Sequence, residues 1–272
     1  MTGSARLRIG FALTLAGVLA LLGGCVSVPQ PDPNNPGREI RQPAENADPE
    51  RRAKVRLELA GLYFARGQSE TALDEVRQAL EARPNLPEAH SLRGLIYASL
   101  GDMARSEQSF KRALELNARD ADAMHNFGWV LCQQQRFDEA DALFGRALAQ
   151  PQYRDQMRSL LARGVCQARA GRWADAERTL TRSYELDPAN PVTAFNLSEV
   201  LLHRGELERA RFYVARINGQ PDLSSAQTLW LAARIERRLG NLAGVQDFGR
   251  QLRDRFPQSA EALRYERGRF DD

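Results

Sequence analysis

The sequence predicts an all-α fold, a solenoid of six repeated helical pairs that ends in a C-terminal capping helix. The first observation is self-similarity at a period of 34 residues from residue 53 onward. The second is a set of glycines at the same point of five repeats: Gly67, Gly101, Gly171, Gly205 and Gly240. The third is composition, since 43% hydrophobic and 27% charged residues are ordinary for a packed globular chain.

Each repeat carries a triad in its second half: a small residue, a large apolar residue four positions later, and a small residue three further on. The triads are Ala72-Val76-Ala79, Ser106-Phe110-Ala113, Ala140-Phe144-Ala147, Ala176-Leu180-Ser183, Ala210-Val214-Ile217 and the weaker Gly244-Phe248-Gln251. Another small residue lies twelve positions before each triad, which lets two helices approach closely while the large residue fills the space opposite. The predicted repeats are 53–86, 87–120, 121–154, 157–190, 191–224 and 225–258, with a two-residue insertion after the third.

The glycines indicate where the first helix of each pair ends, because a helix often closes on a residue of positive φ. The third repeat has Gln134-Gln135-Arg136 at this point, so its turn must form without glycine. Each pair can bury its faces only on its neighbours, as in a quasi-one-dimensional array. An irregular helical bundle with accidental periodicity is the alternative. Residues 259–272 are predicted to be a capping helix or tail.

This pattern resembles the tetratricopeptide repeat, and the resemblance implies a right-handed superhelical solenoid with a protein-binding groove. Positions 2, 5, 9, 12 and 13 of each repeat resemble the lining of that groove. The expected groove residues are Leu57, Phe64, Leu95, His125, Trp129, Leu161, Val165, Phe195, Glu199, Leu202 and Leu229. A mainly apolar groove suits an amphipathic helix or an extended segment with hydrophobic anchors. The alternative for each of these residues is a place in the core between repeats.

The N-terminus indicates export. Residues 9–22 are uncharged and apolar, long enough for a signal peptide and too short to span a bilayer comfortably. The run ends in Leu22-Gly23-Gly24-Cys25, which resembles a bacterial lipobox and implies cleavage after residue 24 and a lipid on Cys25. An ordinary signal peptide with a chance cysteine is the alternative.

Val26 and Ser27 follow the cysteine without an aspartate, so the sorting rule of enterobacteria implies the outer membrane, with the protein anchored by lipid at its periplasmic face. Residues 25–50 contain six of the 13 prolines and are predicted to be an extended tether.

The two remaining cysteines, Cys132 and Cys166, fall on the first helices of neighbouring repeats. Their heights along those helices differ by two positions, or about 3 Å. In an oxidising periplasm this placement favours a disulfide, which would stabilise the fold by roughly 3–4 kcal/mol. Two free buried thiols are the alternative.

The motifs of common enzymes are absent. The sequence contains no phosphate-binding G-x-x-x-x-G-K-[ST] loop, no H-E-x-x-H and no G-x-S-x-G. The three histidines have no ligand spacing, so we expect neither a metal nor a cofactor and no small-molecule substrate. The net charge of +3 is too small to indicate nucleic acid as a partner. We therefore expect a protein that is not an enzyme.

Taken together, the lipobox, the tether and the six repeats resemble the type IV pilus biogenesis and stability lipoproteins, some of which are pilotins. The stretch 123–140 (AMHNFGWVLCQQQRFDEA), with a cysteine in the third and in the fourth repeat, carries most of this resemblance. It implies a role in outer-membrane localisation or multimerisation of the pilus secretin and in pilus stability and twitching motility, with the secretin or another pilus assembly protein as partner. A general periplasmic scaffold for cell-wall enzymes is the alternative.

Overall fold

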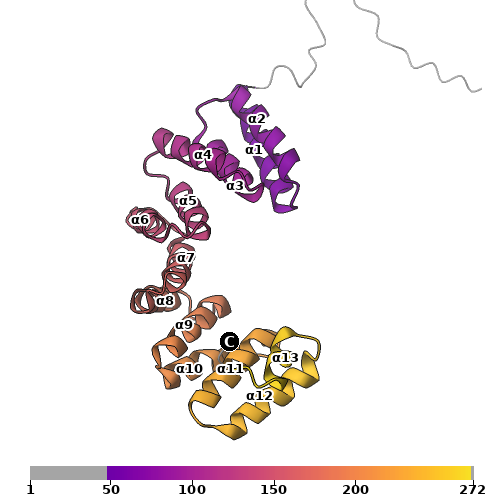
Figure 1. Cartoon of the computed structure of the whole chain (residues 1–272). Coiled ribbons are helices and arrows are strands. Elements are labelled where there is room, and N and C mark those ends of the chain that lie inside the picture. The colour runs from indigo at the N-terminus through magenta and orange to yellow at the C-terminus, as the bar shows by residue number, and fades with distance from the viewer. Residues whose placement is uncertain (1–47, 271–272) are drawn as a thin grey trace, which may run out of the picture. The chain divides into compact units, whose positions relative to one another are not determined.

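The computed structural model describes residues 48–270, and this part of the chain is all-helical, which confirms the predicted fold class. The described residues belong to one compact unit. The described residues form thirteen helices. The helices follow one another in chain order (Figure 1). They are α1 (Pro49–Ala65), α2 (Ser69–Ala82), α3 (Pro87–Ser99), α4 (Met103–Leu116), α5 (Ala121–Gln133), α6 (Phe137–Leu148), α7 (Gln156–Arg169), α8 (Trp173–Leu186), α9 (Pro191–Arg204), α10 (Leu207–Asn218), α11 (Ala226–Arg238), α12 (Leu242–Arg255) and α13 (Ala260–Glu266). The predicted leader, the lipidation site Cys25 and most of the predicted tether lie outside the described residues.

The predicted tether is too long at its C-terminal end. Pro49 was included in it but is the first residue of α1, and Asp48 accepts a hydrogen bond from the backbone N–H of Glu50. Proline is favourable at this position because the first turn of a helix leaves its N–H groups unpaired, and aspartate is a preferred N-cap. The tether therefore ends at or before Asp48.

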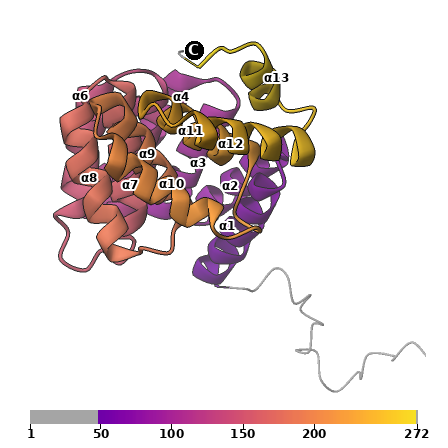
Figure 2. The ribbon, with the colours of Figure 1, turned by 90° about the horizontal axis from the view of Figure 1, so that it is seen from below.

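The helices pack as six pairs, α1 with α2 through to α11 with α12, and each second helix also contacts the first helix of the next pair. The first helices contact one another in turn along the series α1, α3, α5, α7, α9 and α11, whereas within the described chain no second helix contacts the next second helix. In Figure 2 α6 and α8 accordingly form an outer margin, with α3, α7 and α9 nearer the middle. The first helices thus form one continuous inner layer.

The turn in the third pair forms as expected without glycine. The five turn glycines have φ between 72° and 81°, and Gln135 takes the same role with a φ of 62°. Gln135 is the one described residue other than glycine with positive φ. Its backbone N–H donates to the carbonyl of Cys132, as Gly171 does to Ala168 one pair later. The geometry of the array therefore holds Gln135 at a positive φ, which glutamine rarely adopts by itself.

Close helix approach within a pair depends on the small residues of the pattern. Gly164 of α7 faces Leu180 of α8, and a Cβ on Gly164 would lie 2.5 Å from the Cγ of Leu180. Leu180 is completely buried, so it has no free space into which to move. This contact explains why the pattern requires a small residue at this position.

Replacing Gly164 by alanine is expected to lower the free energy of unfolding by about 1–3 kcal/mol, because the added methyl overpacks the α7–α8 contact. Gly145→Ala is the matched control, since Gly145 also lies within a helix and its Cβ would meet nothing within 4 Å. The control should be neutral or slightly stabilising. Urea unfolding of both variants tests this, and equal effects would contradict it.

Candidate protein-binding face

Eight of the eleven predicted groove residues form a half-buried surface on the first helices, which we call the first-helix face. Its members are Leu57, Phe64, Leu95, Trp129, Leu161, Val165, Phe195 and Glu199. They fall into local groups: the two in α1 pack against one apolar cluster, Leu95 and Trp129 against a second, and Leu161 and Phe195 against a third. The core therefore positions these six side chains, while part of the surface of each remains open to a partner.

The other three predicted groove residues are wrong as surface residues. His125, Leu202 and Leu229 are only 5%, 2% and 0% exposed. His125 of α5 is hydrogen-bonded to Ser159 of α7, and Leu202 belongs to the apolar cluster shared by α8 to α11. Leu229 lies in a cluster that includes residues of α13 and Phe270, so the C-terminal segment closes the face at the last repeat.

Arginine side chains border the first-helix face and were missed by the sequence analysis. The guanidinium of Arg169 lies 5.6 Å from the ring centroid of Trp129, and Arg234 forms an ion pair of 3.7 Å with Glu199. Arg169 occupies position 13 of its repeat, one of the expected lining positions, so that signal was available. The face therefore combines apolar anchors with cationic groups that can pair with a partner's carboxylates.

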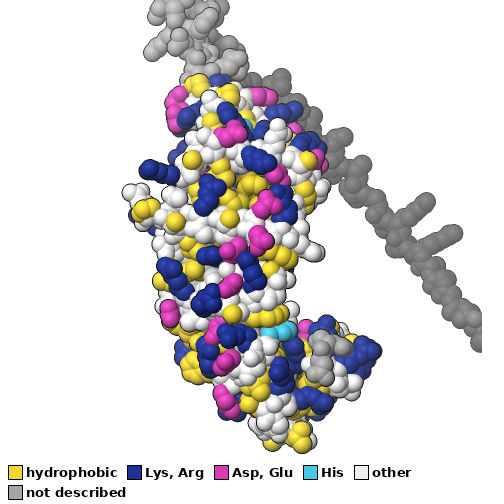
Figure 3. Space-filling view, turned by 60° about the vertical axis from the view of Figure 1, so that its left-hand side comes forward, with side chains coloured by type: hydrophobic (Ala, Val, Ile, Leu, Met, Phe, Trp, Pro, Cys, Tyr) yellow, Lys and Arg dark blue, Asp and Glu magenta, His cyan; other side chains and the backbone are white. Residues whose placement is uncertain are grey.

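The second helices present a different, charged surface. Figure 3 shows Lys and Arg interspersed with Asp and Glu on the side of the molecule that carries α6 and α8. Ion pairs cross from repeat to repeat here, as between Arg136 and Glu107 at 2.5 Å and between Arg209 and Glu177 at 2.6 Å. Hydrogen bonds from Arg136 and Lys111 lower the pKa of Glu107 to about 2. Charged groups on this surface pair with one another, which distinguishes it from the mainly apolar first-helix face.

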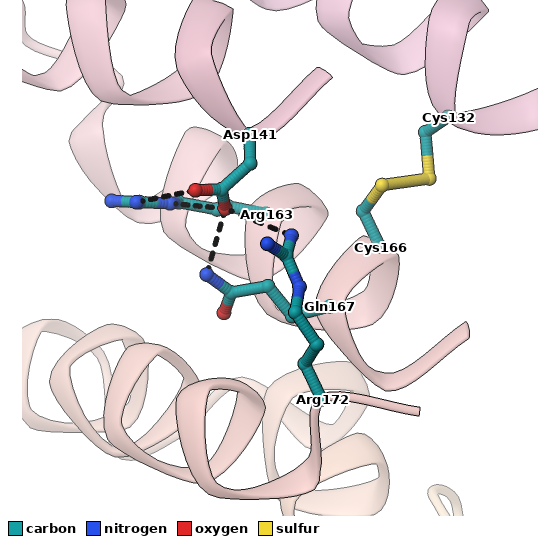
Figure 4. Close-up of a disulfide and its surroundings, with 6 residues drawn as sticks. All are labelled: Cys132, Asp141, Arg163, Cys166, Gln167 and Arg172. Carbon is teal, nitrogen blue, oxygen red and sulfur yellow. Dashed lines mark hydrogen bonds and ion pairs between the residues drawn. A yellow bond between two sulfur atoms is a disulfide. The ribbon is translucent and has the colours of Figure 1, made fainter. Parts of the chain in front are cut away.

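A disulfide and a polar cluster join the third and fourth repeats at the centre of the array (Figure 4). Cys132 of α5 and Cys166 of α7 are bonded, with their Cα atoms 5.8 Å apart and both side chains 1% exposed. Beside them, Asp141 of α6 accepts hydrogen bonds of 2.9 Å from Nε and Nη2 of Arg163 and one of 2.8 Å from Gln167. The two features hold α5 and α6 against α7.

The pKa of Asp141 shows that this cluster stabilises the charged carboxylate. Burial alone would raise it, but the hydrogen bonds and charge of Arg163, the hydrogen bond from Gln167 and the charge of Arg172 outweigh burial and lower it. Arg172 adds an ion pair of 3.5 Å. Gln167 occupies the position at which repeats one and two have tyrosine, so a polar contact replaces a large side chain there.

Replacing Asp141 by asparagine is expected to lower the free energy of unfolding by about 1–3 kcal/mol, because Arg163 loses its bidentate partner in a partly buried site. Asp138→Asn is the matched control on the same helix, since Asp138 is 97% exposed although it also pairs with Arg172. The control should change stability by less than about 0.5 kcal/mol. Thermal unfolding of both variants measures the difference. A D141N protein as stable as D138N would refute a stabilising role of the Asp141–Arg163 contact.

The segment between α6 and α7, which contains the insertion, is anchored by a buried chain of hydrogen bonds. Tyr153 is 8% exposed, and its hydroxyl lies 2.7 Å from Oγ of Ser159, which lies 2.7 Å from Nδ1 of His125. A cavity of about 630 Å³ opens beside the insertion, lined by residues 150–155 together with Arg119, Ala121 and Asp122. The lining of this cavity includes none of the eight residues of the first-helix face.

The described residues were also compared with what a membrane-spanning helix and a metal site require. Over residues 48–270, no helix combines the length and the apolar character needed to cross a bilayer. Within the same range, no group of three His, Cys, Asp or Glu side chains is placed to hold a metal ion.

Comparison with known proteins gives the same repeat family throughout. Tetratricopeptide repeat profiles match residues 85–152, 125–191 and 167–235, and a TPR repeat profile matches residues 61–101. The chain is 26% identical over 217 residues to the type IV pilus assembly protein PilF of Pseudomonas aeruginosa, covering 79% of this chain and 84% of PilF.

Solved structures extend this similarity. The crystal structure of PilW, described as a widely conserved type IV pilus biogenesis factor, superimposes with a TM-score of 0.72 and 29% identity over 78% of this chain and 96% of PilW. The structure of Pseudomonas aeruginosa PilF has a TM-score of 0.69 and 22% identity, covering 82% of this chain and all of that chain.

Proposed function

This chain belongs to the tetratricopeptide repeat family and is homologous to the type IV pilus biogenesis proteins PilF and PilW, and from that premise we propose that it is a pilus assembly factor that acts by binding and not by catalysis. The observation that carries the proposal is the similarity to PilW and PilF over more than three quarters of the chain.

The first-helix face supplies recognition in this proposal. It presents half-buried apolar side chains from five successive first helices, and cationic groups lie at its border. Such a surface suits a segment of a partner protein with hydrophobic anchors and carboxylates. We propose the outer-membrane secretin of the pilus, or another pilus assembly protein, as that partner, with effects on secretin localisation, secretin multimerisation and pilus stability.

The proposed lipid on Cys25 supplies location. A diacylated and N-acylated cysteine anchors stably, where a single chain would not. The anchor would hold the array at the periplasmic face of the outer membrane, where a secretin must assemble. Metabolic labelling with a radioactive fatty acid tests this part, and a Cys25→Ser variant should take up no label.

The binding role is tested first by deletion of the gene, followed by immunoblotting for heat-stable secretin multimers and by a twitching assay. We expect fewer multimers and loss of surface pili. Unchanged multimers together with unchanged piliation would contradict the proposed function.

The face itself is tested by placing a photo-crosslinking residue at Trp129 or Phe195 in the membrane-bound protein. Phe212 of α10 is the matched control, because it is an aromatic residue that is 54% exposed on a second helix. Crosslinks to the secretin from the first two positions and not from the third are expected. Crosslinks to peptidoglycan synthases or hydrolases without secretin would instead support a scaffold for cell-wall enzymes.

A further inference from the structure

The positive charge of the described chain is concentrated at its C-terminal end. Residues 48–225 contain equal numbers of basic and acidic side chains, 25 of each. Residues 226–270 contain nine arginines against five acidic residues. In Figure 3 dark blue side chains gather over this end of the chain, at the lower right of the view. The surplus therefore belongs to the last helical pair and α13.

Six of these nine arginines have no carboxylate partner among the residues that the structure describes. Elsewhere in the described chain ion pairs link successive repeats, and near the C-terminus Arg234 pairs with Glu199 and Arg250 with Asp247. Six others have no carboxylate of the described residues within ion-pair distance: Arg237, Arg238, Arg253, Arg255, Arg264 and Arg267. A guanidinium without a carboxylate retains N–H donors that a ligand can occupy.

Two of the unpaired arginines are held in place by aromatic rings. The guanidinium carbon of Arg237 lies 4.5 Å from the ring centroid of Phe270, and that of Arg253 lies 5.5 Å from the ring of Tyr265. The two rings are themselves in edge contact at 5.8 Å. Stacking fixes the plane of a guanidinium while leaving its outer N–H edge open. Both arginines are exposed, so these edges face solvent.

The rings are in turn fixed by the fold. Phe270 is 8% exposed and packs 5.0 Å from Trp230 of α11. Tyr265 sits directly over Gly249 of α12, where a Cβ would come within 1.9 Å of its ring. The surface is therefore built on rigid contacts between α11, α12 and α13, and little conformational entropy is lost when it binds a ligand.

We propose that Arg237, Arg253, Arg264 and Arg267 form a second binding surface, separate from the first-helix face, that takes an acidic segment of a partner protein. Arg264 of α13 and Arg267, the C-cap residue of α13, are also exposed and lie on either side of Tyr265 in the sequence. Guanidinium groups in fixed planes match the bidentate geometry of carboxylates. Interleaved arginine and aromatic side chains are typical of protein interfaces, whereas attraction to a lipid surface needs only charge.

The test measures binding of a fluorescein-labelled, Glu-rich peptide by fluorescence anisotropy at low salt, with a peptide carrying Gln in place of Glu as the comparison. All proteins are full chains with Cys25→Ser, so that no lipid contributes. We expect the Glu peptide to bind and the Gln peptide not to bind. The triple variant R253E/R264E/R267E should weaken binding at least about tenfold. Failure of the Glu peptide to bind would overturn the proposal.

The matched control reverses two exposed arginines of α1 and the exposed arginine at its C-cap, R51E/R52E/R66E, none of which has a carboxylate partner among the described residues. This control should change the affinity for the Glu peptide by less than about twofold. A loss of affinity equal to that of R253E/R264E/R267E would mean that binding responds only to net charge, which would overturn the proposal. R237K/R253K keeps the charge, so weaker binding by this variant supports bidentate recognition, and unchanged binding argues against it. Circular dichroism checks that each variant is folded.

A parallel sedimentation assay with phosphatidylglycerol vesicles distinguishes an acidic protein segment from a membrane surface as the ligand. Binding to vesicles through the same arginines, without binding of the Glu peptide, would replace the acidic segment by a membrane surface and refute the proposal. These readouts use neither the secretin nor the first-helix face, so their failure leaves the proposed function standing.

Discussion

Replacing Cys132 and Cys166 together by alanine is expected to lower the free energy of unfolding by about 3–4 kcal/mol in oxidising buffer. The bond spans a sequence separation of 34 and links two first helices in the middle of the array. In the unfolded chain it restricts the closed loop, and in the folded chain it joins surfaces that are already packed, with both cysteines 1% exposed. An array stabilised only by contacts between neighbours depends on its central interface.

Chemical denaturation with and without reductant measures this effect. Reductant should lower the unfolding midpoint of the wild-type chain and leave that of C132A/C166A unchanged. A thiol assay on unfolded protein without reductant should find neither cysteine reactive. Two reactive thiols in that assay, or a wild-type midpoint that does not respond to reductant, would refute the bridge and favour two free thiols.

Acidification from pH 7 to pH 4 is expected to lower the free energy of unfolding by about 3 kcal/mol through His125 alone. Burial, with a smaller contribution from the charge of Arg158, lowers the pKa of this histidine from 6.5 to about 4. Its Nδ1 is hydrogen-bonded to Ser159, and its ring packs edge-on against Phe144 at 5.6 Å. The site thus holds a neutral imidazole.

The sign follows from proton uptake. Between the two pKa values the unfolded chain binds a proton at His125 that the folded chain does not bind, so unfolding becomes more favourable as the pH falls. The loss begins near pH 6.5 and is complete below pH 4. Burial also lowers the pKa of His90, and this adds to the same trend.

A pH series of urea unfolding curves tests the assignment to His125. His125→Gln keeps a polar group for Ser159 but cannot titrate, so its stability should fall less between pH 7 and pH 4 than that of the wild type. His203→Gln is the matched control, since His203 is exposed and stacks on Trp173. The control should retain the wild-type slope; an H125Q slope equal to it would contradict the prediction.

The fold was predictable because its signals are local and repeated. The 34-residue period, the small and large residues of each triad, and the glycine turns all act within one pair or between adjacent pairs. The same pattern carried the resemblance that the comparisons with PilW and PilF support. The turn at Gln135 shows the strength of the repeated signal, since the array imposes a positive φ on a residue that rarely adopts one.

The candidate site was predictable in its outline and not in its detail. Repeat position selected eight residues that are half-buried on the first helices and three that are buried. Position alone misplaces them because burial depends on what the neighbouring repeat contributes. His125 is hydrogen-bonded to Ser159, which is in turn hydrogen-bonded to Tyr153 of the α6–α7 segment, and Leu229 packs in a cluster with Phe270.

The sequence by itself determined the repeat, its register and the turns between helices, because helix periodicity and close packing depend on residues a few positions apart. Only the tertiary structure decided which lining positions are open, that α1 begins at Pro49, and that Asp141, Arg163 and Gln167 converge beside Cys132 and Cys166. It also placed arginines of α11 and α12 on the rings of Tyr265 and Phe270. These contacts join residues that are far apart in the chain. They depend on the angle between neighbouring helical pairs.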